Sequence, residues 1–123
     1  MKISTVATVA WLALAGMTLP GAARAHTHLE KATPADNALL AEAPSQLSLE
    51  FSKVARLTAL TLQREGEKEA TKVSALPKEF ATKQTVPLQA LAPGKYLVNW
   101  RVVGEDNHVM AGKLHFTIKA KGQ

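Results

Sequence analysis

The chain has 123 residues, a formal net charge of +5 at pH 7 and no cysteine. The missing cysteines exclude disulfides, thiolate metal sites and cysteine nucleophiles. Nucleic-acid binding has no support either, because the lysines are scattered and aromatic residues make up only 5% of the sequence.

The first 25 residues have the three-part plan of a secretory signal peptide. Lys2 supplies the positive start, an apolar run extends from about Thr5 to Leu19, and small residues follow up to Ala25. The apolar run spans about 15 residues, fewer than the roughly 18 to 20 of a membrane-spanning helix. We therefore predict export with cleavage after Ala25, which leaves one small domain of residues 26–123.

Cleavage after Ala25 would create a metal ligand at the new N-terminus. The free α-amino group of His26 would lie close enough to its own ring Nδ1 for both nitrogens to chelate one metal ion. His28, two residues further on, adds a second imidazole. The alternative is an N-terminal arm whose histidines bind nothing.

Short apolar–polar alternations predict β-strands in the first half of this domain. Residues 29–38 are polar and carry turn formers, so we expect an extended arm followed by a turn. Period-two alternation predicts one strand over residues 46–51, and a second strand is expected over residues 54–63, with an irregular entry near residues 53–56. A loop or hairpin tip is expected at residues 65–68.

The second half continues in the same style. Pro77 argues against a helix over residues 70–80, and Pro87 makes residues 84–88 an edge strand because proline cannot donate to a central ladder. The strongest strand covers residues 96–103, where Trp100 should be the largest core side chain. A final strand alternates over residues 114–118. The whole pattern predicts an all-β sandwich or Greek-key barrel.

Asp106 and His108 lie in the loop that directly follows the strongest strand. In an extended loop this spacing turns both side chains the same way, so a carboxylate oxygen and an imidazole nitrogen can share one cation. The alternative is a polar turn in which Asp106 caps the backbone and His108 is solvated. His115 alternates with Leu114 and Phe116, so we expect it to face solvent away from any site.

The combined donors favour copper. The terminal amine, the imidazoles of His26 and His28, and the pair Asp106 and His108 form a nitrogen-rich set with one carboxylate. Such donors suit Cu(II) in a tetragonal plane, whereas zinc would take a similar set tetrahedrally, and the Irving–Williams order favours copper. Met110 is the only methionine left after cleavage, so no multi-thioether Cu(I) site can form.

The domain sequence resembles the CopC family of periplasmic copper-resistance proteins over essentially all of its length. The resemblance is carried by a set of short motifs that are specific only in combination. These are His26-x-His28-Leu29, Thr33-Pro34-Ala35-Asp36-Asn37-Ala38, Ala43-Pro44, Leu47-x-Leu49-x-Phe51-Ser52, Leu91-x-Pro93-Gly94-x-Tyr96-x-Val98-x-Trp100-Arg101-Val102-Val103, Asp106-x-His108 and Gly112-x-x-x-Phe116.

The resemblance implies a cupredoxin-like or immunoglobulin-like β-barrel of about seven strands that binds one Cu(II). It implies His26, Asp106 and His108 as the metal ligands, with His28 as a further or axial ligand. It also implies a periplasmic location and an inner-membrane copper transporter of the CopD type as a partner.

Two departures from the family pattern affect the expected site. Many members carry a glutamate near the copper after the Phe-Ser of the first core strand, whereas this chain has Lys53, and a cation cannot bind a metal. Some members also have a methionine-rich Cu(I) loop, whereas residues 54–80 contain no methionine. We therefore predict a Cu(II)-only site without transfer between two sites.

The resulting functional hypothesis is a monomeric, non-catalytic carrier or buffer for Cu(II) in copper homeostasis and resistance. One alternative is a copper-dependent oxidative enzyme, because an N-terminal histidine chelate resembles the histidine brace of lytic polysaccharide monooxygenases. Another is a metal-free exported interaction module in which the histidines are incidental.

Overall fold

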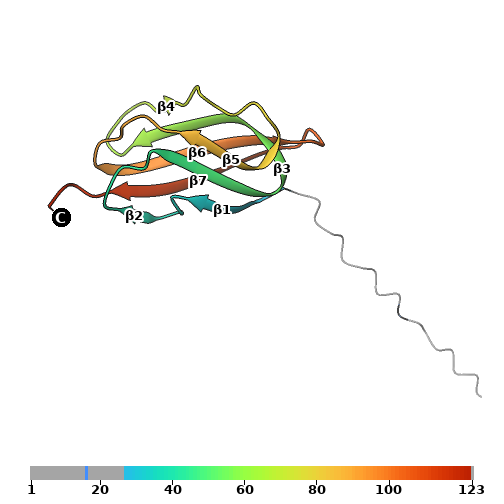
Figure 1. Cartoon of the computed structure of the whole chain (residues 1–123), viewed down its shortest axis with the longest axis horizontal. Coiled ribbons are helices and arrows are strands. Elements are labelled where there is room, and N and C mark those ends of the chain that lie inside the picture. The colour runs from blue at the N-terminus through green and yellow to red at the C-terminus, as the bar shows by residue number, and fades with distance from the viewer. Residues whose placement is uncertain (1–15, 17–26, 123) are drawn as a thin grey trace, which may run out of the picture.

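The computed structural model describes residue 16 and residues 27–122, and all regular structure in that part is β-strand (Figure 1). The strands are β1 (Leu29–Thr33), β2 (Ala38–Leu40), β3 (Gln46–Arg64), β4 (Thr71–Lys72), β5 (Ala81–Pro87), β6 (Gly94–Gly104) and β7 (Val109–Ile118). The prediction of an all-β domain with about seven strands is confirmed. His26 and all of the predicted signal peptide except residue 16 lie outside the described residues. In the described part no helix is long and apolar enough to cross a membrane.

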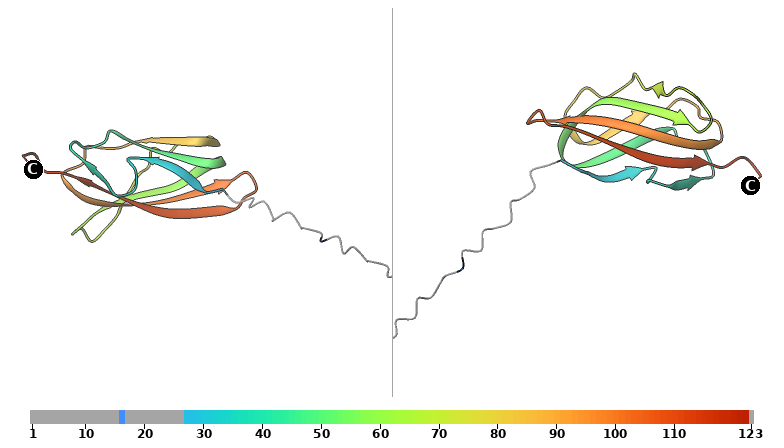
Figure 2. Two further views of the ribbon diagram at one scale, coloured as in Figure 1. Left: turned by 90° about the horizontal axis from the view of Figure 1, so that it is seen from below. Right: turned by 180° about the vertical axis from the view of Figure 1, so that it is seen from behind.

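Strand β3 organises the domain because it belongs to both of its layers. Its first half pairs antiparallel with β1 and β5, and its second half pairs antiparallel with β6 and β4. The pairing with β5 shifts register between Glu50 and Ala55, where β3 bends from one layer into the other (Figures 1 and 2). The prediction of separate strands over 46–51 and 54–63 was therefore wrong, although the expected irregular stretch coincides with this bend.

In the sheet order β1-β3-β6-β7-β2, the first and last strands, β1 and β2, follow each other in the sequence. β2 pairs parallel with β7, and only the turn at residues 34–37 separates it from β1. This turn is fastened to β7, because Asp36 Oδ1 accepts the His115 N–H at 2.8 Å and the Asn37 N–H donates to the His115 carbonyl at 2.7 Å. The predicted extended arm is thus a strand, a turn and a second strand.

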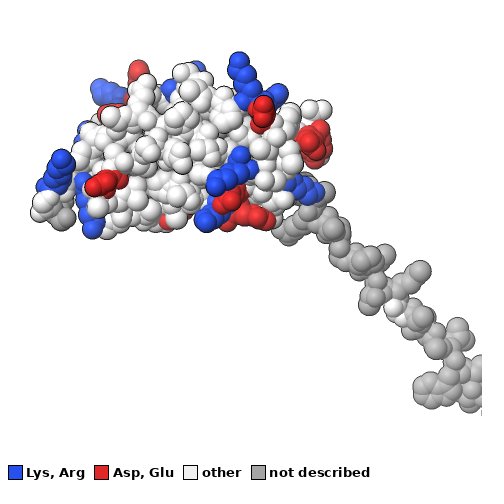
Figure 3. Space-filling view, in the orientation of Figure 1, with Lys and Arg blue, Asp and Glu red and all other residues white. Residues whose placement is uncertain are grey.

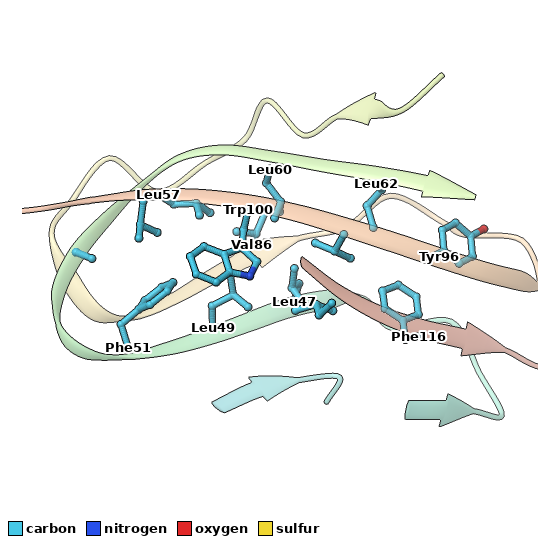
Figure 4. Close-up of a cluster of buried hydrophobic side chains, with 14 of the residues drawn as sticks. Leu47, Leu49, Phe51, Leu57, Leu60, Leu62, Val86, Tyr96, Trp100 and Phe116 are labelled. Carbon is cyan, nitrogen blue, oxygen red and sulfur yellow. The ribbon is translucent and has the colours of Figure 1, made fainter. Parts of the chain in front are cut away.

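The core lies between the two layers and is built around Trp100, as predicted (Figure 4). The indole is 6% exposed and meets Phe51 edge-on, with ring centroids 5.4 Å apart. Tyr96 stacks on Phe116 at 5.3 Å. Gly112 is required beside the indole, because a β-carbon there would lie 2.3 Å from Trp100 Cζ2.

The two ends of the sandwich carry different segments of the chain. β1 begins at the end where the turn between β6 and β7 projects, and β7 finishes at the opposite end (Figure 1). Basic and acidic side chains stand next to each other on the face shown in Figure 3, including near the end where β1 begins.

Candidate metal centre

The turn at residues 104–108 is rigidly supported. It joins β6 and β7, which are paired up to Val103 and Val109. The Gly104 N–H donates to the His108 carbonyl at 2.9 Å and the Asn107 N–H donates to the Gly104 carbonyl at 3.0 Å. Asn107 adopts φ +64°, a left-handed conformation that asparagine tolerates better than most residues. Side chains on this turn are therefore held in place by the sheet.

Asp106 and His108 contact each other on this turn. Asp106 Oδ1 accepts the His108 backbone N–H at 3.1 Å, and Asp106 Oδ2 lies 2.7 Å from His108 Nδ1. The hydrogen bond from the His108 side chain, followed by the one from its backbone, lowers the pKa of the Asp106 carboxyl below its usual 3.8. The carboxylate thus caps the backbone and orients the imidazole, which is how carboxylates support metal-binding histidines. The backbone cap expected for a polar turn is present, whereas a cation shared by Asp106 and His108 stays a prediction.

The start of the described domain lies against the same turn. Thr27 is only 8% exposed, and a β-carbon placed on Gly104 would lie 2.7 Å from Asp106 Oδ1 and 3.7 Å from Thr27 Oγ1. A hollow of about 500 Å³ extends from this point, lined by Thr27, Ser52, Lys53, Val54, Thr82, Glu105 and Asp106. The chain just after the predicted cleavage site is therefore next to the Asp106 carboxylate.

His28 faces a different direction. Its side chain is 67% exposed and its Nε2 lies 3.9 Å from Glu30 Oε1. Within residues 27–122 no three of the His, Asp and Glu side chains form a group that could hold a metal ion. The structure thus brings Asp106 and His108 together, pairs His28 with Glu30 instead, and does not describe His26.

His115 is exposed, as predicted, but it has a partner that the sequence did not reveal. Its Nδ1 lies 3.5 Å from Asp36 Oδ1, near the opposite end of β7 from His108. The hydrogen bond from the His115 backbone is the main cause that lowers the pKa of Asp36 below 3.8. His115 therefore serves the fold and lies outside the candidate site.

Sequence reasoning missed two residues of the site, Thr27 and Ser52. Ser52 lines the hollow, and its Oγ accepts the His28 N–H at 3.0 Å. Their positions gave a weak signal, since Thr27 separates the two N-terminal histidines and Ser52 follows the last core residue of its strand segment. Lys53, singled out as a departure, does line the hollow beside Asp106.

Fold and site together define a small β-sandwich whose N-terminal segment meets an Asp-x-His turn at one end. The sequence model of the CopC domain family matches residues 29–119 of this chain. The chain therefore belongs to the CopC family.

Two relatives show the extent of the similarity. The Escherichia coli K12 protein YobA is 36% identical over 100 residues, which cover 77% of this chain and 80% of YobA. Copper resistance protein C of Pseudomonas syringae pv. tomato is 31% identical over 121 residues, which cover 85% of this chain and 90% of that protein.

Solved structures share the fold. CopC from Methylosinus trichosporium OB3b superposes with a TM-score of 0.66 at 22% identity, covering 80% of this chain and 98% of that structure. PcoC, a methionine-rich copper resistance protein from Escherichia coli, superposes with a TM-score of 0.59 at 29% identity, covering 77% and 100%.

Proposed function

We propose that this protein is a periplasmic carrier or buffer that binds one Cu(II) in copper homeostasis and resistance. Its membership of the CopC family and the copper-resistance names of its relatives support copper as the cargo. Export with removal of residues 1–25, a monomeric state and the absence of catalysis belong to the same proposal. An inner-membrane transporter of the CopD type is the proposed partner.

The position of Thr27 is the observation that carries this proposal. Thr27 lies beside the Asp106 carboxylate, and consecutive Cα atoms are only about 3.8 Å apart. If His26 is the first residue of the mature protein, its amine and imidazole are within reach of Asp106 and His108. We propose these three residues as the copper ligands.

The chemistry of the donors suits Cu(II) at neutral pH. Asp106 stays ionised well into the acid range because its pKa is lowered, so acidification displaces copper first from the amine and the ring of residue 26. Copper affinity should fall as the pH drops through the imidazole range near 6.5. Lys53 lines the hollow at the position where many family members carry a glutamate. Its positive charge disfavours the binding of a metal cation close to it. His28 as a further ligand stays a prediction.

The decisive test compares two chains that differ by one residue. One begins at His26, and the other retains Ala25 and so keeps the imidazole while its N-terminal amine belongs to another residue. Competition titration with a chelator should give one Cu(II) per mature chain and at least about tenfold weaker binding for the extended chain, because displacing a direct ligand should cost no less than losing an outer-shell partner. Electron paramagnetic resonance should show a different set of donors in the extended chain, because its amine belongs to Ala25.

Single-residue variants complete this test. His108→Ala should lose at least about tenfold in Cu(II) affinity, whereas His115→Ala removes another exposed histidine, at the other end, and should leave the Cu(II) affinity unchanged. His28→Ala decides whether that imidazole contributes. Equal affinity together with the same electron paramagnetic resonance spectrum for the mature and Ala25-extended chains would refute the proposed site.

A further inference from the structure

The N-terminal segment, residues 27 and 28, is joined to β3 by two hydrogen bonds between His28 and Ser52. The His28 N–H donates to Ser52 Oγ at 3.0 Å, and the Ser52 N–H donates to the His28 carbonyl at 2.9 Å. The strand pairing of β1 with β3 begins at the next residue, where Leu29 lies opposite Phe51. Ser52 thus extends this pairing by one residue towards the N-terminus, using its side chain as well as its backbone.

This fastening lies two residues from the proposed copper ligand at position 26. Thr27 stands between them and is buried beside Gly104 and Asp106. Chain ends normally fray unless something ties them down, and ordering a frayed segment during metal binding costs affinity. A segment that is already held can offer the N-terminal donors to the Asp106 turn without that cost.

The side chain of His28 takes no part in the fastening. Both hydrogen bonds with Ser52 use the backbone of His28, while its exposed imidazole lies near Glu30. The effect of the Ser52 hydroxyl can therefore be separated from any effect of the His28 imidazole.

We propose that Ser52 is a positioning residue for copper binding, which holds the N-terminal segment against the Asp106 turn before the metal arrives. This inference rests on the proposed function, because it assumes His26 as a ligand. Ser52 contacts no ligand side chain in the described part of the chain, and it acts through the backbone of His28.

The test uses the mature protein beginning at His26 and the variant Ser52→Ala. Loss of one hydroxyl acceptor should make the His28 amide exchange with deuterium about tenfold faster in the metal-free protein. The dissociation constant for Cu(II) should rise about fivefold to tenfold, the amount expected for one hydrogen bond. The electron paramagnetic resonance spectrum should stay unchanged, because the donor atoms are the same. Ser52→Thr keeps the hydroxyl and should restore both exchange and affinity.

Ser48→Ala is the matched control. Ser48 lies on the same strand, is 8% exposed and places its hydroxyl 3.5 Å from that of Thr85, away from the N-terminal segment. We expect neither the His28 exchange rate nor the Cu(II) affinity to change in this variant.

Two results would overturn the role of Ser52. One is a folded Ser52→Ala protein that binds Cu(II) as tightly as the parent. The other needs no variant: a His28 amide that exchanges in the metal-free parent as fast as in an unstructured peptide shows that the segment is not held. If the extra Ala25 changes neither the Cu(II) affinity nor the electron paramagnetic resonance spectrum, the proposed site is refuted instead. The His28 exchange rates tell the two failures apart.

Discussion

Gly104 shows how one residue sets the position of the candidate ligands. It is the last residue of β6, it is buried, and the Asp106 carboxylate lies where its side chain would otherwise project. A β-carbon at this position would come within 2.7 Å of Asp106 Oδ1. Since the conflict is with the end of a side chain, the carboxylate can rotate away while the backbone stays.

Gly104→Ala should therefore impair the site more than the fold. We expect the carboxylate to turn away from His108, the pKa of Asp106 to rise back towards 3.8, and the Cu(II) affinity to fall about tenfold. Titration of the Asp106 carboxyl carbon by NMR and chelator competition measure the two effects. In the control Gly122→Ala the added β-carbon has nothing within 4 Å, so the Asp106 pKa and the Cu(II) affinity should stay unchanged. An Asp106 pKa equal to that of the parent would show that the carboxylate did not move.

The residues of the site differ in how far the sequence could predict them. Asp106 and His108 are two positions apart in one loop, so their contact follows from local spacing. Ser52 meets His28 across 24 residues, and Asp36 meets His115 across 79. Local alternation carries no information about such pairs, because their contact depends on which strands become neighbours. The position of His26 stays a prediction.

At the level of elements, the bend of β3 depends on a buried glutamine in β5. Gln84 is 1% exposed, and its Nε2 donates to the carbonyls of Ala55 at 2.7 Å and Glu79 at 3.0 Å. Ala55 is the residue at which the register between β3 and β5 resumes after the shift. The Gln84 side chain thus replaces the ladder hydrogen bonds that the bend interrupts, and it supports the segment that carries Lys53 and Val54 into the hollow.

Gln84→Leu should destabilise the domain without touching the site directly. The leucine fills the same space but leaves two carbonyls without their donor, which costs roughly 2 kcal/mol or more. Thermal denaturation should show a Tm lower by about 10 °C for a domain of this size. Gln89→Leu makes the same chemical change at an exposed position and should leave Tm nearly unchanged. A Gln84→Leu protein that melts like the parent would mean that water replaces the amide at no cost.

The strands themselves were largely predictable, and the way they join was not. Alternation located the strands around Leu47, Trp100 and Phe116, because burial of one face imposes a period of two. It could not show that β3 continues through the bend, since residues 52–54 follow neither pattern and are held by contacts with other segments.

At the scale of the whole molecule, the contact between Asp36 and His115 holds the edges of the two layers together. The turn at residues 34–37 connects the edge strand β1 of one layer to β2 at the edge of the other. Asp36 fastens this turn to β7 through the His115 N–H, and this hydrogen bond lowers the pKa of Asp36. The ionised carboxylate therefore favours the folded state.

Asp36→Ala should lower Tm at neutral pH, and the sign of the pKa shift sets how this loss depends on pH. A lowered folded-state pKa gives stability that is present above the ordinary value of 3.8 and disappears as the pH falls through the folded value. The Tm difference from the parent should therefore shrink in acid. Asp36→Asn retains an acceptor without the charge, so its pH dependence should follow that of Asp36→Ala. A Tm difference between Asp36→Ala and the parent that stays constant down to pH 2 would mean that the substitution acts through the conformation of the turn and not through the carboxylate charge.

The two ends of the sandwich can be put to separate uses. β7 finishes at the end remote from the Asp106 turn, so a resin, an electrode or a fluorescent label attached after it leaves that turn facing outwards. An affinity handle placed ahead of His26 would instead abolish the terminal amine and add bulk beside Thr27. Preparations made with such a handle would report the chemistry of the handle and of four histidine side chains that lack the His26 terminal amine.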